Sequence, residues 1–273
     1  MTAPMQLRGR VAVVTGAGGG IGRAIALALA RRGVHLALVD VDAEGLAGAA
    51  EAAAALGART VVHRFDVTDR DAVAGLPEQV RLALGRVDLL VNNAGVALGG
   101  TFEQVRADDF DWLMAINFDA VVRMTRAFLP LLQTSDDARI VNVSSIYGIV
   151  APAGQTAYAA SKFAVRGFSN ALRHELDGSR VGVTVVHPGG VATAIARSAR
   201  APPDVPAEEV ERRRAAADKK LRMAPDRAGE IIVRAVERRR ARVLVGGDAV
   251  VVALLERFAP VGYWRVLRRA FEL

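Results

Sequence analysis

The stretch VAVVTGAGGGIGRAIALALA, residues 11–30, decides the fold. A short apolar run leads into a glycine-rich loop and then into an Ala/Leu-rich run that Gly33 closes. A chain that turns sharply from a strand into a helix, with its amides close to a diphosphate, has no room for Cβ atoms in the loop. The pattern therefore predicts a strand, a dinucleotide-binding turn and a helix, although a flexible turn alone would also use glycines. The loop residues assigned to the cofactor are Gly16, Gly18, Gly19, Gly20, Ile21 and Gly22.

Six further apolar runs resemble this first strand. They are continuous rather than alternating, which is typical of strands buried on both faces of a parallel sheet. Helix-like stretches separate them, for example residues 109–132 and 156–176. We therefore expect a Rossmann-type α/β fold, in which a doubly wound, seven-stranded parallel sheet carries helices on both faces. The expected strands are 11–15, 34–40, 60–66, 87–93, 138–145, 181–189 and 241–247.

The chain of 273 residues fits a single large domain, and no interdomain linker interrupts it. We expect residues 1–247 to form an NAD-binding catalytic domain. Within it, residues 194–230 are Pro-rich and then charged, so we predict an insertion over the mouth of the sheet that contacts the substrate. Residues 248–273 are predicted to form a C-terminal amphipathic helical extension.

Composition narrows the class of protein. The chain has no cysteine, which excludes disulfides and thiolate chemistry, and its four histidines are scattered, so we expect no metal site. No run of 18 uncharged apolar residues predicts a membrane span, and we expect a cytoplasmic protein. The net charge of +7 belongs to the C-terminal quarter, where a solvated, Arg-rich helix explains it. No aromatic residues interleave with the arginines of 212–242, so we expect no nucleic-acid partner.

An acidic residue ends the second expected strand. A carboxylate at Asp40 can accept hydrogen bonds from both ribose hydroxyls of an adenosine, and it would repel a 2′-phosphate. Gly19, in the adjoining loop, offers no cation that would offset this repulsion. Asp40 and Gly19 therefore predict NAD rather than NADP, unless Asp40 only caps the following helix. Val41, next to Asp40, is also assigned to the cofactor.

The third and fourth expected strands also end in candidate cofactor residues. Asp66 is placed to bond the adenine amino group, and the amide of Val67 to read the edge of the ring. Asn93, Ala94 and Gly95 follow the fourth strand, where small residues let the backbone pass close to a cofactor and an Asn amide can join adjacent strands. A simple turn is the alternative for each of these segments.

The sequence YAASK, residues 158–162, places a phenol and an ammonium on one face of a helix. A neighbouring ammonium favours the phenolate, and together with the positive nicotinamide ring of an oxidised cofactor we expect it to lower the pKa of Tyr158 by ~1–3 units. Tyr158 would then serve as a general base. The other lysines of this arginine-rich chain are Lys219 and Lys220. The choice of lysine at 162 therefore indicates a compact ammonium between a phenol and ribose hydroxyls.

Two further polar residues join this pair in the expected site. Ser145 ends the fifth strand and is placed to hydrogen-bond a substrate oxygen, with Ser144 as the competitor for that role. Asn117 lies within an expected helix, where asparagine is a poor helix former. We expect a buried Asn117 to hold a water that connects Lys162 to solvent.

In chain order, these motifs resemble those of the short-chain dehydrogenase/reductase family. The similarity runs from residue 7 to about 193 and includes TGAGGGIG, NNAG, YAASK and PGGVAT. It implies a catalytic tetrad of Asn117, Ser145, Tyr158 and Lys162. It also implies that Pro188, Gly189, Val191 and Thr193 position the nicotinamide carboxamide. A homodimer or homotetramer is expected, although the C-terminus is longer and more basic than the compact family form requires.

The expected function is NAD(H)-dependent hydride transfer between the cofactor and a hydrophobic secondary alcohol or ketone. Tyr158 would carry the proton, Ser145 hold the oxygen and Lys162 bind the ribose. The alternatives are an NADPH-dependent carbonyl reductase of the 3-oxoacyl type and a non-catalytic, NAD-binding regulator. Candidate substrate contacts, mostly apolar, are Val96, Ile146, Tyr147, Ala151 and Gly190.

The last residues, 261–273, read VGYWRVLRRAFEL. On a helix, Trp264, Leu267 and Phe271 would gather on one side, with arginines beside or across from them. Such a stripe can pack on its own or a partner subunit, close over the substrate pocket, or lie on an acidic membrane surface. We expect a dimer whose tail lies at the edge of the substrate mouth, with peripheral membrane contact as a further role.

Overall fold

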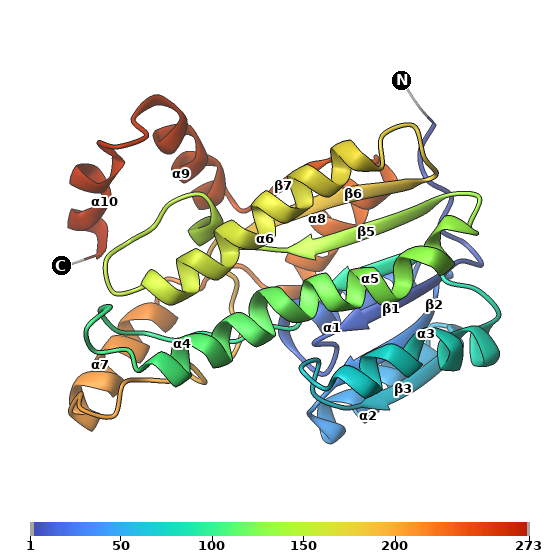
Figure 1. Cartoon of the computed structure of the whole chain (residues 1–273), viewed down its shortest axis with the longest axis horizontal. Helices are drawn as coiled ribbons and strands as arrows, with labels where there is room; N and C mark the ends of the chain where they lie inside the picture. Colours follow the sequence, from blue (N-terminus) through green and yellow to red (C-terminus); the bar gives the residue numbers. More distant parts are fainter. Residues whose placement is uncertain (1–2, 272–273) are drawn as a thin grey trace.

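The computed structural model describes residues 3–271, with side chains through Arg268. Its centre is one seven-stranded parallel sheet in the order β3-β2-β1-β4-β5-β6-β7 (Figure 1). The predicted Rossmann-type fold is therefore confirmed. The strands are β1 (Val11–Thr15), β2 (His35–Asp40), β3 (Thr60–Arg64), β4 (Leu89–Asn92), β5 (Ala138–Val143), β6 (Val181–Pro188) and β7 (Arg242–Val245).

Helices connect the strands and cover both faces of the sheet (Figure 1). A π-helical turn, Ala115–Asp119, joins α4 to α5, and a short 3₁₀ helix, Ile146–Gly148, follows β5. The α-helices are α1 (Gly20–Ala30), α2 (Ala43–Ala54), α3 (Arg70–Leu84), α4 (Ala107–Met114), α5 (Ala120–Gln133), α6 (Thr156–Glu175), α7 (Ala207–Asp218), α8 (Pro225–Glu237), α9 (Gly247–Phe258) and α10 (Tyr263–Phe271).

Both faces of the sheet are buried, which explains the continuous apolar runs. In β1, Ala12 and Val14 belong to the core formed with α1, α2 and α8, while Val11 and Val13 belong to the core formed with α3, α5 and α6. All four side chains are fully buried. A strand covered on both sides has no solvent-facing positions, so its sequence does not alternate between apolar and polar residues.

The helix predicted over 109–132 contains a wide turn that its sequence did not reveal. The chain runs from α4 through the π-helical turn into α5, and Asn117 lies at the centre of that turn. A π turn adds one residue to a helical turn and re-aims the side chains around it, and such turns are frequent at functional sites. Here it directs the fully buried Asn117 side chain to the segment that follows β4.

Three helices, α7, α9 and α10, lie beyond the carboxyl ends of the strands (Figure 1). α7 belongs to the expected insertion, whereas residues 225–230 of that segment begin α8, a core helix that packs on α1. Arg200 fastens the inserted segment to the body. Its backbone forms a parallel bridge with Leu98, and its guanidinium lies 3.6 Å from the ring centre of Trp112.

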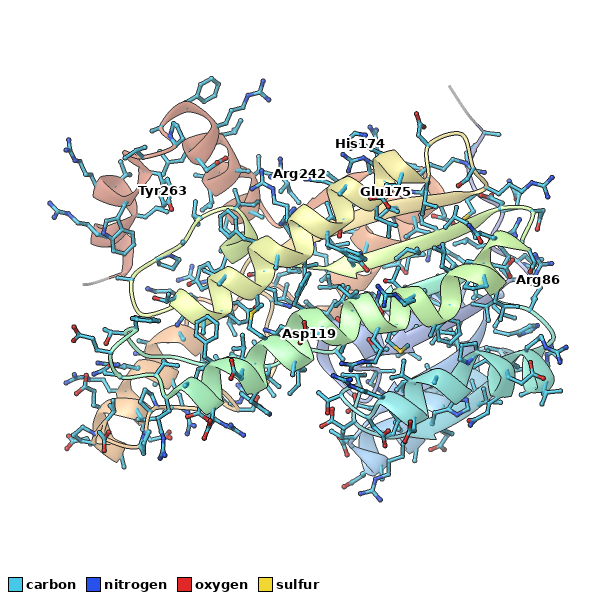
Figure 2. The ribbon with its side chains drawn as sticks, in the orientation of Figure 1. Arg86, Asp119, His174, Glu175, Arg242 and Tyr263 are labelled. Atoms are coloured by element: carbon cyan, nitrogen blue, oxygen red, sulfur yellow. The ribbon has the colours of Figure 1, made fainter. Side chains whose placement is uncertain are left out.

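The C-terminal helix contacts the loop that precedes α6. The Tyr263 hydroxyl accepts a hydrogen bond from the backbone N–H of Ala151 at 3.0 Å, and Figure 2 shows Tyr263 on α10. Trp264 and Leu267 are half-buried, while the side chains of Arg269 and Phe271 lie outside the described residues. Over residues 3–271, no helix is long and apolar enough to cross a membrane.

Candidate active site

Apart from Tyr158 and Lys162 on α6, the residues predicted to bind a cofactor lie at or just after the carboxyl ends of strands. The glycine loop follows β1, and Asp40–Val41, Asp66–Val67 and 93–95 follow β2, β3 and β4. The segment Gly189–Thr193 follows β6, and Pro188 is the last residue of that strand. In open parallel sheets, ligands bind at this edge where the strand order reverses, which here is between β1 and β4.

The glycine loop is shaped by two close approaches. A Cβ atom on Gly22 would overlap the carbonyl oxygen of Gly16, and Gly16 itself has a φ of +66°. The Asn93 side chain donates to the carbonyl oxygens of Thr15 and Gly16 at 3.0 and 3.2 Å, so it joins the end of β4 to the loop. These contacts leave Gly16 and Gly22 no room for a side chain.

The outer part of the loop fits a dinucleotide diphosphate. Gly19 has no atom within 4 Å of the position of a Cβ, so its backbone is open at the N-terminus of α1. Gly20 has a φ of +51°, and its Cβ position would lie 3.1 Å from the Thr193 methyl group. Exposed amides at the positive end of a helix form the environment that an anionic diphosphate requires.

Asp40 is held beside the glycine loop. One carboxylate oxygen accepts the N–H of Gly18 at 2.8 Å, and the other accepts the N–H of Val41 at 2.7 Å. The alternative role for Asp40 was to cap the following helix. The residue that caps α2 is instead Asp42, whose carboxylate accepts the N–H of Glu44. Asp40 therefore does not serve as the helix cap.

The segments after β3 and β4 have local partners. Asp66 accepts hydrogen bonds from both the amide and the hydroxyl of Thr68 at 2.8 Å, which fixes a tight turn. Asn92 donates to Asn142 on β5 at 2.8 Å, as expected for an amide that joins adjacent strands. The Gly95 backbone is close to the tetrad, since its Cβ position would lie 3.3 Å from Lys162 Nζ.

Tyr158 and Lys162 lie together on one face of α6, as their spacing predicted. Lys162 Nζ is 5.6 Å from the centre of the Tyr158 ring, and it donates a hydrogen bond to the Val143 carbonyl at 3.3 Å. Tyr158 is 9% exposed and Lys162 is 4% exposed. The ammonium is therefore buried between the end of β5 and the phenol.

The two serines at the end of β5 have different roles. Ser144 is buried, and its hydroxyl donates to the Lys162 carbonyl at 2.8 Å. Ser145 is half-buried; its hydroxyl oxygen accepts the N–H of Tyr147 at 3.1 Å, and its side chain acts to lower the pKa of the neighbouring Tyr158 phenol. The structure therefore brings Ser145, rather than Ser144, to the side of the tyrosine hydroxyl.

Asn117 binds protein groups on both sides of its amide. Its oxygen accepts the N–H of Val96 at 2.8 Å, and its nitrogen donates to the Val96 carbonyl and the Ser161 hydroxyl at 3.0 and 3.1 Å. Asn117 thus connects the segment after β4 to α6, next to Gly95 and Lys162. The water that we expected it to hold stays a prediction.

Two of the candidate substrate contacts pack with the Tyr158 ring. Tyr147 meets Tyr158 edge to face, with ring centres 6.0 Å apart, and Val96 packs in the same apolar cluster. Ile146 precedes Tyr147 in the 3₁₀ helix, and Gly190 lies in the turn after β6. Ala151 is exposed and bonded to Tyr263.

Comparison with known proteins agrees with this geometry. The family model for short chain dehydrogenases matches residues 10–204. Putative oxidoreductase SadH of Mycobacterium tuberculosis is 43% identical over 95% of this chain and 94% of its own. The 1-deoxy-11-beta-hydroxypentalenate dehydrogenase of Streptomyces avermitilis is 39% identical over 72% of this chain and 74% of its own. A short chain dehydrogenase/reductase from Burkholderia phymatum in complex with NAD superposes with a TM-score of 0.86 at 30% identity, covering 94% and 95% of the two chains.

This chain belongs to the short-chain dehydrogenase/reductase family. Its relatives are oxidoreductases, so it is an enzyme that acts on CH–OH groups with NAD(P) as the acceptor. No cluster of three or more His, Cys, Asp or Glu side chains is arranged to hold a metal ion in the described part of the dehydrogenase.

Three supporting residues of the dehydrogenase escaped the sequence interpretation. The Thr15 hydroxyl accepts the N–H groups of Asn93 and Ala94, both at 3.0 Å. Ser161 receives the Asn117 amide, and His187 lies 2.9 Å from the Ser145 carbonyl through Nδ1. Thr15 and Ser161 belong to TGAGGGIG and YAASK, and His187 directly precedes PGGVAT, so their place in or beside a motif was the available signal.

Electrostatics in the dehydrogenase bear on one expectation. Burial raises the pKa of Tyr158 to about 12, with the Ser145 hydrogen bond opposing this shift, and burial lowers the pKa of Lys162 to about 8. The sequence predicts that Lys162 and the positive ring of an oxidised cofactor together lower this pKa. In the protein without cofactor the pKa shifts in the opposite direction, because burial of the phenol dominates. The lowering expected with the oxidised cofactor bound stays a prediction.

The cost of burying Lys162 generates a testable prediction. The unfolded chain keeps this proton up to pH 10.5 and the folded chain releases it near pH 8, so the cost is present below pH 8 and disappears as the pH rises to 10.5. Its size is on the order of 3 kcal/mol. We expect Lys162→Met to raise the melting temperature at pH 7, to raise it less at pH 9.5, and to abolish turnover.

The control is Lys219→Met, because Lys219 is exposed. Calorimetry at both pH values should show no comparable gain for this variant. A lower melting temperature for Lys162→Met at pH 7 than for the wild type would contradict the predicted cost of the buried ammonium.

Proposed function

We propose that this chain is a cytoplasmic, NAD(H)-dependent oxidoreductase that interconverts a hydrophobic secondary alcohol and its ketone. The observation that carries the proposal is the buried Tyr158–Lys162 pair, with the Ser145 side chain next to the phenol. A non-catalytic regulator has no need for a phenol and an ammonium buried together, since each loses solvation there.

The residues divide the chemistry among them. Bound NAD would supply the acceptor for the hydride that leaves the carbinol carbon. Ser145 Oγ holds the substrate oxygen, and Tyr158 takes the hydroxyl proton or, in the reverse direction, returns it. The raised pKa keeps Tyr158 protonated at neutral pH, which suits proton donation to a ketone. The oxidation direction requires additional positive charge near the phenol.

An apolar substrate suits the surroundings of the phenol. Tyr158 belongs to a cluster with Leu98 and Leu113, against which Val96 and Tyr147 pack. These side chains offer a substrate extensive apolar contact and few hydrogen bonds, which is typical of a site for a hydrophobic ligand. The hydroxyl-bearing compound in the name of the Streptomyces relative agrees with an alcohol substrate.

The proposed reaction is tested with a panel of short and long secondary alcohols and ketones, followed by NADH absorbance. We expect turnover by the wild type, and a loss of several orders of magnitude in Tyr158→Phe, because the proton carrier is removed while the ring is kept. NADH fluorescence should show that the variant still binds the cofactor. Ser144→Ala is the matched control for Ser145→Ala, and only the latter should lose most of its kcat.

Two outcomes would reject this function. Wild-type protein that binds NADH but turns over no member of the panel would favour the regulator. A Tyr158→Phe variant that keeps more than about a tenth of the wild-type activity would show that another group carries the proton.

NAD is favoured over NADP by the position of Asp40. Its carboxylate is fixed at the Gly18 amide, where a 2′-phosphate would meet negative charge. One observation favours the alternative cofactor, because Arg64 lies opposite Asp40 in the β2–β3 register and donates to the Val41 carbonyl at 3.3 Å. The Arg64 guanidinium is therefore close to Asp40, and a guanidinium binds a phosphate such as the 2′-phosphate of NADP well.

We expect the wild type to have a lower KM for NADH than for NADPH. Asp40→Ala should shift the ratio toward NADPH by about tenfold or more, which corresponds to ~1.4 kcal/mol. Adding Arg64→Ala should reverse that gain, since the phosphate then loses its cation. Steady-state kinetics with both cofactors measure the ratio. A wild-type preference for NADPH would refute the assignment of Asp40.

We also propose that the C-terminal extension, residues 248–273, which follows the catalytic unit of residues 1–247, is a contact surface for anionic lipid. Large apolar side chains are exposed along α9, the α9–α10 loop and α10, including Phe258 at 80%. Arg257, Arg265 and Arg268 are exposed around them. A second copy docked on this face would bring arginines against arginines, whereas an anionic bilayer complements them. The apolar residues are Val250, Val251, Leu254, Phe258, Val261 and Val266.

This surface is tested with Phe258→Asp, which places an anion at the end of α9, between the exposed apolar residues of α9 and those of the following loop and α10. Wild-type protein should sediment with vesicles rich in phosphatidylglycerol and not with phosphatidylcholine alone, and the variant should lose most of this binding. The control is Leu82→Asp on α3, which alters an exposed leucine elsewhere. Light scattering measures whether the wild type and the variant form the expected homodimer or homotetramer. A Phe258→Asp variant that dissociates without changing vesicle binding would assign the face to a second copy.

A further inference from the structure

One carboxylate ties the turn after β6 to the C-terminal extension. Asp248, in the first turn of α9, accepts a hydrogen bond from the backbone N–H of Gly190 at 2.6 Å. This length is short for an N–H···O bond and is typical of a bond to a charged acceptor. The N-terminus of α9 also favours a negative charge at this position.

Glycines on two segments make room for this carboxylate. A Cβ atom on Gly189 or on Gly246 would overlap the Asp248 side chain, and Gly246 has a φ of +110°. A Cβ atom on Gly190 would overlap the Lys220 carbonyl. Asp248 is exposed to solvent on its outer side, and its carboxylate occupies the space that side chains on Gly189 and Gly246 would need.

The Gly190 peptide is held on both sides by different segments. Its carbonyl accepts the N–H groups of Arg222 and Met223 at 3.0 and 2.9 Å, while its N–H goes to Asp248. The neighbouring N–H of Gly189 donates to the Val245 carbonyl at 2.9 Å. The bond to Asp248 is the link in this set that a side-chain substitution can remove.

The same turn lies between the glycine loop and the tetrad. At one end, the Thr193 methyl group lies against Gly20 of the loop. At the other, His187 donates from Nδ1 to the carbonyl of Ser145, since a carbonyl oxygen only accepts. A dinucleotide whose diphosphate occupies the loop would therefore place its reactive ring against residues 188–193.

We propose that Asp248 is a positioning residue that holds the 188–193 turn in the conformation that binds the nicotinamide end of the cofactor. The inference rests on the proposed NAD(H) function. Asp248 acts through the Gly190 amide and leaves the expected adenosine and diphosphate contacts untouched, because those come from the segments at the ends of β1, β2 and β3. Its removal should therefore weaken binding of the complete dinucleotide and spare fragments that lack nicotinamide.

The experiment compares two ligands on one variant. NADH binding is measured by fluorescence and ADP-ribose binding by calorimetry, with wild type, Asp248→Ala and Asp248→Asn. We expect Asp248→Ala to weaken NADH binding about tenfold and to change ADP-ribose binding less than twofold. Asp248→Asn keeps an acceptor oxygen and should recover part of the NADH affinity. Asp226→Ala, which alters an exposed acidic residue in the first turn of α8, is the control and should change neither.

The outcomes separate the inference from the function on which it rests. Wild-type protein that binds no NADH would reject the proposed function, and the role of Asp248 with it. If the wild type binds NADH and Asp248→Ala does so equally well, only the positioning role is wrong. Equal losses for NADH and ADP-ribose would show that Asp248 supports the fold as a whole, which also overturns the inference.

Discussion

The close approach of Gly16 and Gly22 is the constraint on which the rest of the site depends. The carbonyl of Gly16 occupies the space that a side chain on Gly22 would need, so α1 leaves β1 at a fixed distance and direction. Asn93 bonds the same segment, and Thr15 accepts the amides of the chain after β4. The crevice between β1 and β4 is thereby set by backbone contacts, and the polar side chains of the tetrad are placed relative to it.

Burial of charge is the second determinant of the site. Lys162 loses solvation between β5 and α6, and Tyr158 loses it beside the lysine, so each group is pushed toward its neutral form. Such an arrangement costs stability, since an apolar residue would fill the same space without the loss of hydration. Sites that depart from the stability optimum in this way are usually functional. The π-helical turn at Asn117 is a second such departure, because it interrupts an otherwise regular helix.

The C-terminal quarter completes the walls of the site rather than extending away from it. Asp248 bonds the turn after β6, Tyr263 bonds the loop before α6, and Arg200 joins the inserted segment to the chain after β4. Each contact joins the C-terminal quarter to a segment at the carboxyl side of the sheet, where the ligand sites of parallel α/β proteins lie. An exposed, arginine-flanked apolar face on the same helices places the proposed lipid contact near the substrate side of the molecule.

The sequence by itself determined the strands, the glycine loop and the shared face of Tyr158 and Lys162, because each follows from local periodicity or from spacing within one element. Only the tertiary structure decided which serine meets the phenol, since Ser144 and Ser145 are neighbours whose difference lies in the helix packed against them. It also decided the direction of the tyrosine pKa shift, which depends on burial by distant segments. The bond between Gly190 and Asp248 joins residues 58 apart, and no local pattern encodes such a contact.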